Sequence, residues 1–210
     1  MTPLRRFVLA AALWLPASFF LWAVLAPAVV WPAARISAWL LPALLPEAVA
    51  GIEQIGPALE IETRLVTEAT PEQRAGILIL TANPLIYAWC IAVFAGLVMA
   101  TPLEARQRLI QFAVGTPVLL AVEAWGAVFD VLKLLAFDAG PLGAAAIEQA
   151  GLNVEAVALG YQFGYLILPA VMPILLWVVL NREFLETLVG WRAELDAGSE
   201  GRSDSRKESA

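Results

Sequence analysis

The chain has 210 residues, of which 60% are hydrophobic, and its mean hydropathy is +0.76. A soluble domain is nearer half apolar, and here the surplus is concentrated in long runs, so the sequence predicts an α-helical integral membrane protein. The net charge is −6, with no histidine and one cysteine. These counts exclude a basic nucleic-acid-binding face, histidine-dependent triads and metal sites, and an internal disulfide.

The first apolar run covers residues 7–31 and follows Arg5 and Arg6. At about 1.5 Å per residue it exceeds the hydrocarbon core of about 30 Å, so we expect a first membrane span over 7–31. A signal peptide is the alternative, because "APA" at 26–28 resembles a cleavage site. The apolar region of a signal peptide is only about 7 to 15 residues long, which favours an uncleaved helix.

An outer segment over residues 32–82 follows. "ARISAWLLPALLPEAV" is short and interrupted by proline, which favours a helix lying in the membrane interface. In "ALEIETRLVT" apolar and charged residues alternate, which predicts a half-buried strand that can pair with "GILILTA" at 76–82. Between them "TPEQ" at 70–73 resembles a capping box that opens one helical turn. We therefore expect a small β-hairpin outside the membrane.

The second span is expected at 84–100. After it, Thr101 can cap a helix, Pro102 suits the first helical position, and Glu104 completes a capping box. This predicts a helix over about 102–136 that crosses the membrane over about 107–134, with a kink at Pro117.

A loop with a possible short helix is expected at 137–153, and the fourth span at about 156–180. Residues 1–190 would form a single membrane domain, and the polar residues 191–210 a disordered cytoplasmic tail. Positively charged side chains near the membrane favour the cytoplasmic side, and this bias predicts that both termini are cytoplasmic. The basic residues on that side would be Arg5, Arg6, Arg106, Arg108, Arg182 and Arg192.

Charged residues within the third span are the candidate functional residues. Glu123 and Asp130 are seven residues apart on one helical face, and Lys133 is placed to pair with Asp130. One interpretation is a polar, partner-binding patch of Glu123, Trp125, Asp130 and Lys133. The other is an interfacial Asp130–Lys133 ion pair, with Glu123 as a neutral hydrogen-bonding group between helices.

Four further residues are candidates of lower specificity. Gly160 and Gly164 form a small-xxx-small face for helix packing, with Gln162 between them as a polar group. Asn83 either caps the second span or faces a partner at the outer surface. Cys90 lacks an activating base and is not expected to be a nucleophile.

The order of segments resembles that of the exosortase H-associated membrane proteins of Gram-negative bacteria. The resemblance covers roughly residues 4–190 and rests on "LWLPASFFLW", "NPLIYAW", "EAWGAVFDVLKLLAF" and "ALGYQFGYLILPAVMPILLW". It implies an accessory to an exosortase, a membrane enzyme thought to cleave sorting signals from exported proteins. Exosortase activity is associated with Cys, Arg and His, and this chain has no histidine, so the resemblance assigns no catalytic residues.

We therefore expect a non-catalytic inner-membrane accessory that contacts an exosortase or its sorting-signal substrate at the outer face of the membrane. Its other expected partners are membrane lipids, and we expect no nucleic acid, cofactor or metal. The alternative is a membrane enzyme or carrier that acts on a lipid or a lipid-linked glycan, with Glu123 as acid or base. A third possibility is a structural membrane protein whose polar groups only fix helix packing.

Overall fold

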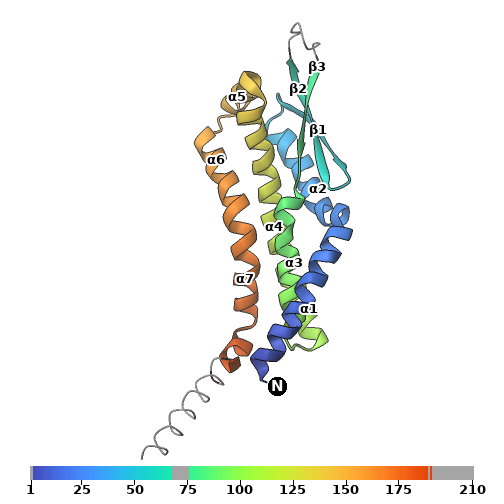
Figure 1. Ribbon diagram of the computed structural model, residues 1–210. Helices are drawn as coiled ribbons and strands as arrows, with labels where there is room; N and C mark the ends of the chain where they lie inside the picture. The colour runs from blue at the N-terminus through green and yellow to red at the C-terminus, as the bar shows by residue number, and fades with distance from the viewer. Residues whose placement is uncertain (1, 68–75, 189, 191–210) are drawn as a thin grey trace, which may run out of the picture.

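The computed structural model describes residues 2–67, 76–188 and 190, and these form a helical bundle with a small sheet at one end (Figure 1). The elements in chain order are α1 (Pro3–Val24), α2 (Ala26–Leu44), β1 (Val49–Ile55), β2 (Ala58–Thr67), β3 (Gly76–Ala82), α3 (Leu85–Ala100), α4 (Ala105–Lys133), a π-helical turn (Leu134–Asp138), α5 (Gly140–Gln149), α6 (Val154–Gln162), a second π-helical turn (Phe163–Ile167) and α7 (Leu168–Leu180).

Helices α1, α3 and α4 and the pass formed by α6 and α7 lie side by side along the bundle (Figure 1). Helices α3 and α4 are central: α3 contacts α1, α4 and α7, and α4 contacts α2, α3, α6 and α7. The sheet, α5 and the top of α2 lie at one end, which we call the sheet end. Residue Pro3 and the end of α7 lie at the other, which we call the N-terminal end.

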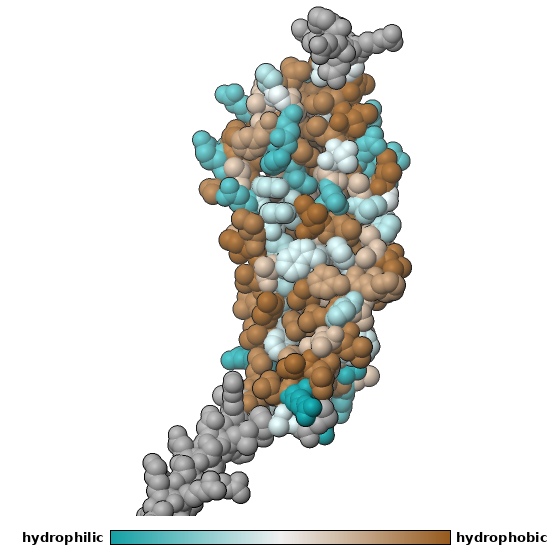
Figure 2. Space-filling view, in the orientation of Figure 1, coloured by the Kyte–Doolittle hydropathy of each residue, from teal (hydrophilic) through white to brown (hydrophobic). Residues whose placement is uncertain are grey.

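Among the described residues, two helical segments are long and apolar enough to cross a membrane, namely Pro3–Val24 and the continuous stretch Val154–Leu180. Helix α3 is apolar but has only 16 residues. No residue of α1 is fully buried. Many of its large apolar side chains, such as Leu13 and Phe20, face outward, whereas Phe7 packs inward against Trp177. Figure 2 shows apolar residues over much of the lower part of the visible face, with hydrophilic residues gathered closer to the sheet end. The four-span arrangement remains a prediction.

The first apolar run forms two helices, so the boundary predicted at residue 31 is wrong. Helix α1 ends at Val24, Leu25 leaves helical geometry, and α2 begins at Ala26. Pro27 explains the break, because it has no N–H to donate and its ring would clash with the carbonyl four residues earlier. The helix expected to lie in the interface is thus part of α2, which buries one side against the bundle.

The predicted hairpin is present as β2 and β3, which pair antiparallel with Ile61 opposite Leu80. Strand β1 was not predicted from the sequence. It pairs with the other side of β2 and gives the order β1-β2-β3. A register shift near Gly51 interrupts the regular alternation of β1, and Gly56 adopts a positive φ of 61° in the tight turn that follows. The "TPEQ" segment lies outside the described residues.

The predicted start of the third helix is also wrong. Glu104, not Thr101, is the N-cap of α4: its side chain accepts from the backbone of Gln107, and the Gln107 side chain accepts from Glu104 N at 3.0 Å. Pro102 therefore lies before the helix rather than in its first turn. Helix α4 continues through Pro117 to Lys133, and a π-helical turn follows it. The short helix considered possible within 137–153 is present as α5.

The last helical pass contains a π-helical turn at Phe163–Ile167, two residues before Pro169. Proline there removes one backbone donor and crowds the carbonyl four residues earlier, which favours the wider π-type spacing. The predicted disordered tail, residues 191–210, lies outside the described residues.

Candidate functional site

Glu123 lies on the inward side of α4 and is fully buried. Neither of its carboxylate oxygens has a hydrogen-bond partner among the described residues. The thiol of Cys90 on α3 is close enough to interact with it electrostatically. An ionised carboxylate in such surroundings would cost several kcal/mol. The packing of the bundle alone therefore gives no reason for a glutamate at this position.

Asp130 lies two helical turns nearer the sheet end and is 9% exposed. Its carboxyl group lies near the backbone of Asn83 and the hydroxyl of Tyr87. Tyr87 is fully buried, and its hydroxyl makes no hydrogen bond within the described residues. Asn83 itself accepts a hydrogen bond from Leu85 N at 3.2 Å and so supports the start of α3.

The predicted Asp130–Lys133 ion pair is wrong. Lys133 Nζ instead lies 2.5 Å from Asp138 Oδ2, and the two side chains are 30% and 46% exposed. The π-helical turn between Lys133 and Asp138 explains why these two residues pair, because its i→i+5 spacing brings residues five apart to one side of the helix. The Lys133 ammonium also lies 5.9 Å from the centre of the Tyr161 ring.

Trp125 lies on the outward side of α4 and joins it to α6. Its indole N–H donates to the carbonyl oxygen of Gly160 at 3.0 Å, and its ring stacks on Phe129 at 4.6 Å. Gly160 and Gly164 both face α4: a Cβ at Gly160 would overlap the Phe129 ring, and one at Gly164 would lie 2.9 Å from Trp125. The small-xxx-small face therefore packs within this chain.

An apolar groove of about 450 Å³ runs between α2 and α6, with α4 as its floor. Trp125 forms one wall, and on its other side lies a second groove that includes the exposed side chain of Gln162. Glu123 is not among the residues that line either groove. The residues that line the first groove are Ile36, Leu40, Leu44, Ala121, Ala124, Trp125, Val128, Phe129, Leu132, Leu152, Asn153, Ala156 and Val157.

A buried polar cluster at the N-terminal end was not predicted from the sequence. Gln111 Nε2 donates to Asn181 Oδ1 at 2.8 Å, and Asn181 Nδ2 donates back to Gln111 Oε1 at 3.2 Å. Nearby, Trp177 Nε1 donates to Thr101 Oγ1 at 2.9 Å. These bonds join α4 and α3 to α7 across about 70 residues of sequence. A lone glutamine inside an apolar run, as at Gln111, is the signal that could have pointed to it.

The candidate residues thus lie in separate places rather than in one patch. Asn83, Asp130 and Lys133 gather at the sheet end, Glu123 lies inside the bundle, and Trp125 lines its lateral surface. Gln162 and the two glycines belong to α6 and the turn after it. Within the described residues, no group of three or more Asp, Glu or Cys side chains is placed to hold a metal ion.

Comparison with known proteins gives one match. The family described as exosortase H-associated membrane protein matches residues 1–184, which is most of the chain. No curated protein and no solved structure matches. The match covers well over half of the chain, and the chain belongs to the exosortase H-associated membrane protein family.

Proposed function

We propose that the protein is a non-catalytic accessory of an exosortase-type protein-sorting system in the bacterial inner membrane. It contacts the sorting enzyme or its substrate at the outer face of the membrane. The observation that carries this proposal is the family match over residues 1–184, because its description names both the membrane and the exosortase association. The absence of histidine from the sequence supports a non-catalytic role.

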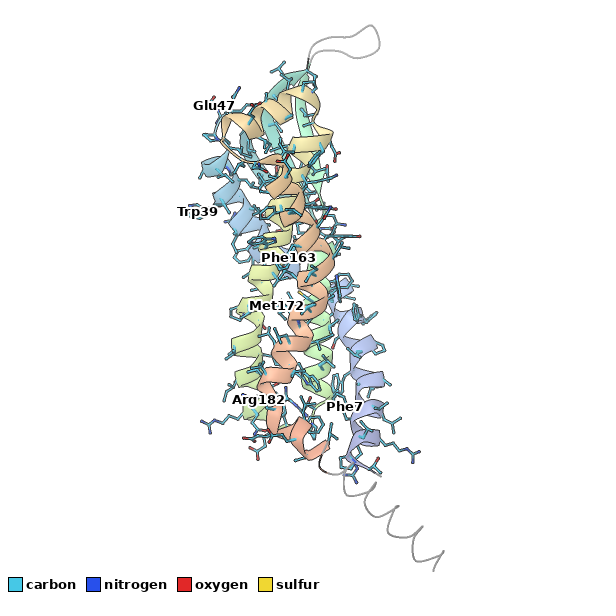
Figure 3. The ribbon with its side chains drawn as sticks, turned by 90° about the vertical axis from the view of Figure 1, so that its left-hand side faces the viewer. Phe7, Trp39, Glu47, Phe163, Met172 and Arg182 are labelled. Carbon is cyan, nitrogen blue, oxygen red and sulfur yellow. The ribbon has the colours of Figure 1, made fainter. Side chains whose placement is uncertain are left out.

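The arrangement of the helices supports a four-span topology with both termini in the cytoplasm. Arg5 and Arg6 lie at the start of α1, Arg106 and Arg108 at the start of α4, and Arg182 just after α7. All five belong to the N-terminal end of the bundle, and Figure 3 shows Arg182 there and Glu47 at the opposite end. Basic residues favour the cytoplasmic side of a membrane, so the sheet end faces outward.

The sheet offers the surface for a partner. In the order β1-β2-β3, the outer edge of β3 has no strand partner among the described strands. Ile77 and Ile79 on β3 are 57% and 54% exposed, and with the exposed Val66 opposite Ile77 on β2 they form an apolar patch on the sheet. An extended segment of the enzyme or substrate can add to such an edge by main-chain hydrogen bonds.

A photocrosslinking amino acid at Ile79 tests this contact in native membranes. The expected product is a crosslink to an exosortase or to a protein with its sorting signal. The matched control is Phe20 on α1, which is 73% exposed and predicted to face lipid. If both positions give the same products and neither includes a protein partner, the sheet is not the contact surface.

A second experiment tests whether the polar residues of α4 take part in partner binding. The Glu123 carboxyl group is fully buried, so it can affect a partner only through the packing of α4, and by that route Glu123→Gln is expected to weaken recovery of the complex. A crosslinker at Trp125 locates the partner along the bundle. Unchanged recovery would remove Glu123 from the partner-binding residues. The alternative role, chemistry on a lipid or lipid-linked glycan, requires Glu123 to reach a lipid, whereas its side chain is fully buried. It would gain support from turnover of such a substrate by the purified protein.

A further inference from the structure

The free edge of β3 presents a regular row of backbone groups. Successive residues of a strand direct their N–H and C=O groups to opposite sides. The carbonyl oxygen of Leu78 accepts from the hydroxyl of Thr63 on β2 at 2.6 Å, so the backbone of Leu78 faces β2. The backbone groups of Ile77, Ile79 and Thr81 therefore point to the free edge, where a further strand can pair with them.

Three cross-strand rows make up the outward face of the sheet beside this edge. Directly opposite residues share a face, and here the rows change from apolar to acidic along β3. From the start of β3 they are Val66 with Ile77, Glu62 with Ile79, and Glu60 with Thr81. On the other side of β2, Glu53 lies opposite Glu60 and extends the third row.

The acidic row is not neutralised within the described residues. There the one ion pair within 4.0 Å joins Lys133 to Asp138, so no lysine or arginine pairs with Glu53, Glu60 or Glu62. Like charges directly opposite each other destabilise a sheet, and Glu53 and Glu60 are such a pair. A cation supplied by a partner would relieve this repulsion.

The direction of β3 places the rows relative to the membrane. Because β3 leads directly into α3, the Thr81 row is nearest the helices and the Ile77 row is farthest from them (Figure 1). The acidic row thus separates the apolar residues from the membrane, which argues against a lipid as the occupant. A second copy is excluded as an antiparallel partner, since β3 runs toward the membrane in every copy.

We propose that the free edge of β3 binds, in antiparallel order, an extended partner segment with a basic residue followed by two apolar residues at alternate positions. This inference rests on the proposed function and names the chemistry of the segment that the sheet receives. Antiparallel addition continues the order of the sheet, and the added strand then runs away from the membrane.

Each position of the added strand follows from the row beside it. Its basic residue lies next to Thr81, and a long side chain there crosses this small residue toward Glu60, two strand spacings or about 9.6 Å away. The two apolar residues lie next to Ile79 and Ile77 and cover their exposed side chains.

The experiment measures binding of a fluorescein-labelled peptide, KTITIT, by fluorescence anisotropy. The full chain is held in phosphatidylcholine nanodiscs, and empty nanodiscs give the background. In antiparallel order the isoleucine N–H groups point at β3 and the threonine N–H groups point away. N-methyl groups on the first two threonines therefore leave this edge of the peptide free and prevent the peptide from pairing with itself.

Two altered peptides test the backbone and the charge. Moving the N-methyl groups to the isoleucines should weaken binding at least about tenfold, because at least two main-chain hydrogen bonds are lost. Replacing the lysine with glutamate should weaken it at least about threefold, because attraction to the acidic row becomes repulsion.

A pair of double variants locates the charge on the protein. Glu53→Gln with Glu60→Gln should weaken binding of KTITIT about twofold to fivefold and bring it close to that of the glutamate peptide. Glu47→Gln with Glu155→Gln removes the same charge from exposed positions outside the strands and should leave binding unchanged. A photocrosslinking amino acid at Ile79 should label the peptide, and one at Phe20 should not.

The outcomes separate this inference from the proposed function. Absence of KTITIT binding, or equal binding of both N-methylated forms, would overturn strand addition. Equal binding of the lysine and glutamate peptides, or equal effects of the two double variants, would overturn the basic segment. The proposed function stands or falls by the protein crosslink from Ile79 in native membranes, so such a crosslink together with any of these results would overturn the inference alone.

Discussion

Replacing Glu123 with methionine should stabilise the bundle. The side chain is fully buried, and both oxygens lack a hydrogen-bond partner among the described residues. A buried polar group left unpaired costs about 1 to 3 kcal/mol, and methionine has a similar length without that group. We therefore expect Glu123→Met to raise the free energy of unfolding by about 1 to 3 kcal/mol.

Gln111→Met provides the matched comparison on the same helix. Gln111 is also buried, but its amide exchanges two hydrogen bonds with Asn181, at 2.8 and 3.2 Å. Methionine there would remove both bonds and leave part of the Asn181 amide unpaired. We expect a loss of about 1 to 3 kcal/mol, opposite in sign to the change at Glu123.

The chain contains its own reporter for this measurement. Cys90 is the only cysteine and is fully buried, so a fluorogenic maleimide reacts with it when the bundle opens. Because Cys90 lies near Glu123, circular dichroism in a detergent titration serves as an independent probe. If Glu123→Met unfolds at or below the wild-type midpoint by both probes while Gln111→Met is destabilised, the carboxyl group has a partner and the argument is refuted.

Three further variants test the helix contacts by the same unfolding measurements. Gly160→Val should destabilise the bundle by about 1 to 3 kcal/mol, since its side chain would overlap Phe129, and a smaller residue at 129 should restore part of the loss. Trp125→Phe removes one hydrogen bond between helices and should cost about 0.6 to 1.7 kcal/mol, so a wild-type midpoint would mean that the bond contributes nothing. Lys133→Met removes an exposed ion pair with Asp138 and should change stability by about 1 kcal/mol or less; a larger loss would show that the pair anchors the π-helical turn.

Local patterns in the sequence predicted the helices and one hairpin because their causes are local. Alternating residues in β2 fix which side chains face the bundle, and Ile61 and Thr63 are buried as that alternation requires. Strand β1 could not be predicted because Gly51 and a register shift interrupt its alternation of buried and exposed side chains. The helix start at Glu104 was misplaced because Thr101 also has capping chemistry, but its hydroxyl is used by Trp177 from a distant helix.

The site residues were harder to place because their partners are set by tertiary contacts. Lys133 pairs with Asp138 only because a π-helical turn changes the spacing, and the sequence gives no period-five signal for it. Gln111 and Asn181 are 70 residues apart in the sequence, so neither residue predicts the other as its hydrogen-bond partner. By contrast, the inward position of Glu123 follows from helical periodicity, since Ala127 and Asp130 on the same face are also buried.

The position of Glu123 also limits how it can affect a partner. A protein or lipid that approaches through the membrane meets Trp125 and the groove, which lie on the outward side of α4, and does not touch the buried carboxyl group. Any loss of complex recovery in Glu123→Gln must then act through the packing of α4 against α3, near Cys90. Glu123→Met separates this route from simple destabilisation: a variant that is more stable and yet recovers less partner would show that the carboxyl group governs the arrangement of these helices rather than their stability.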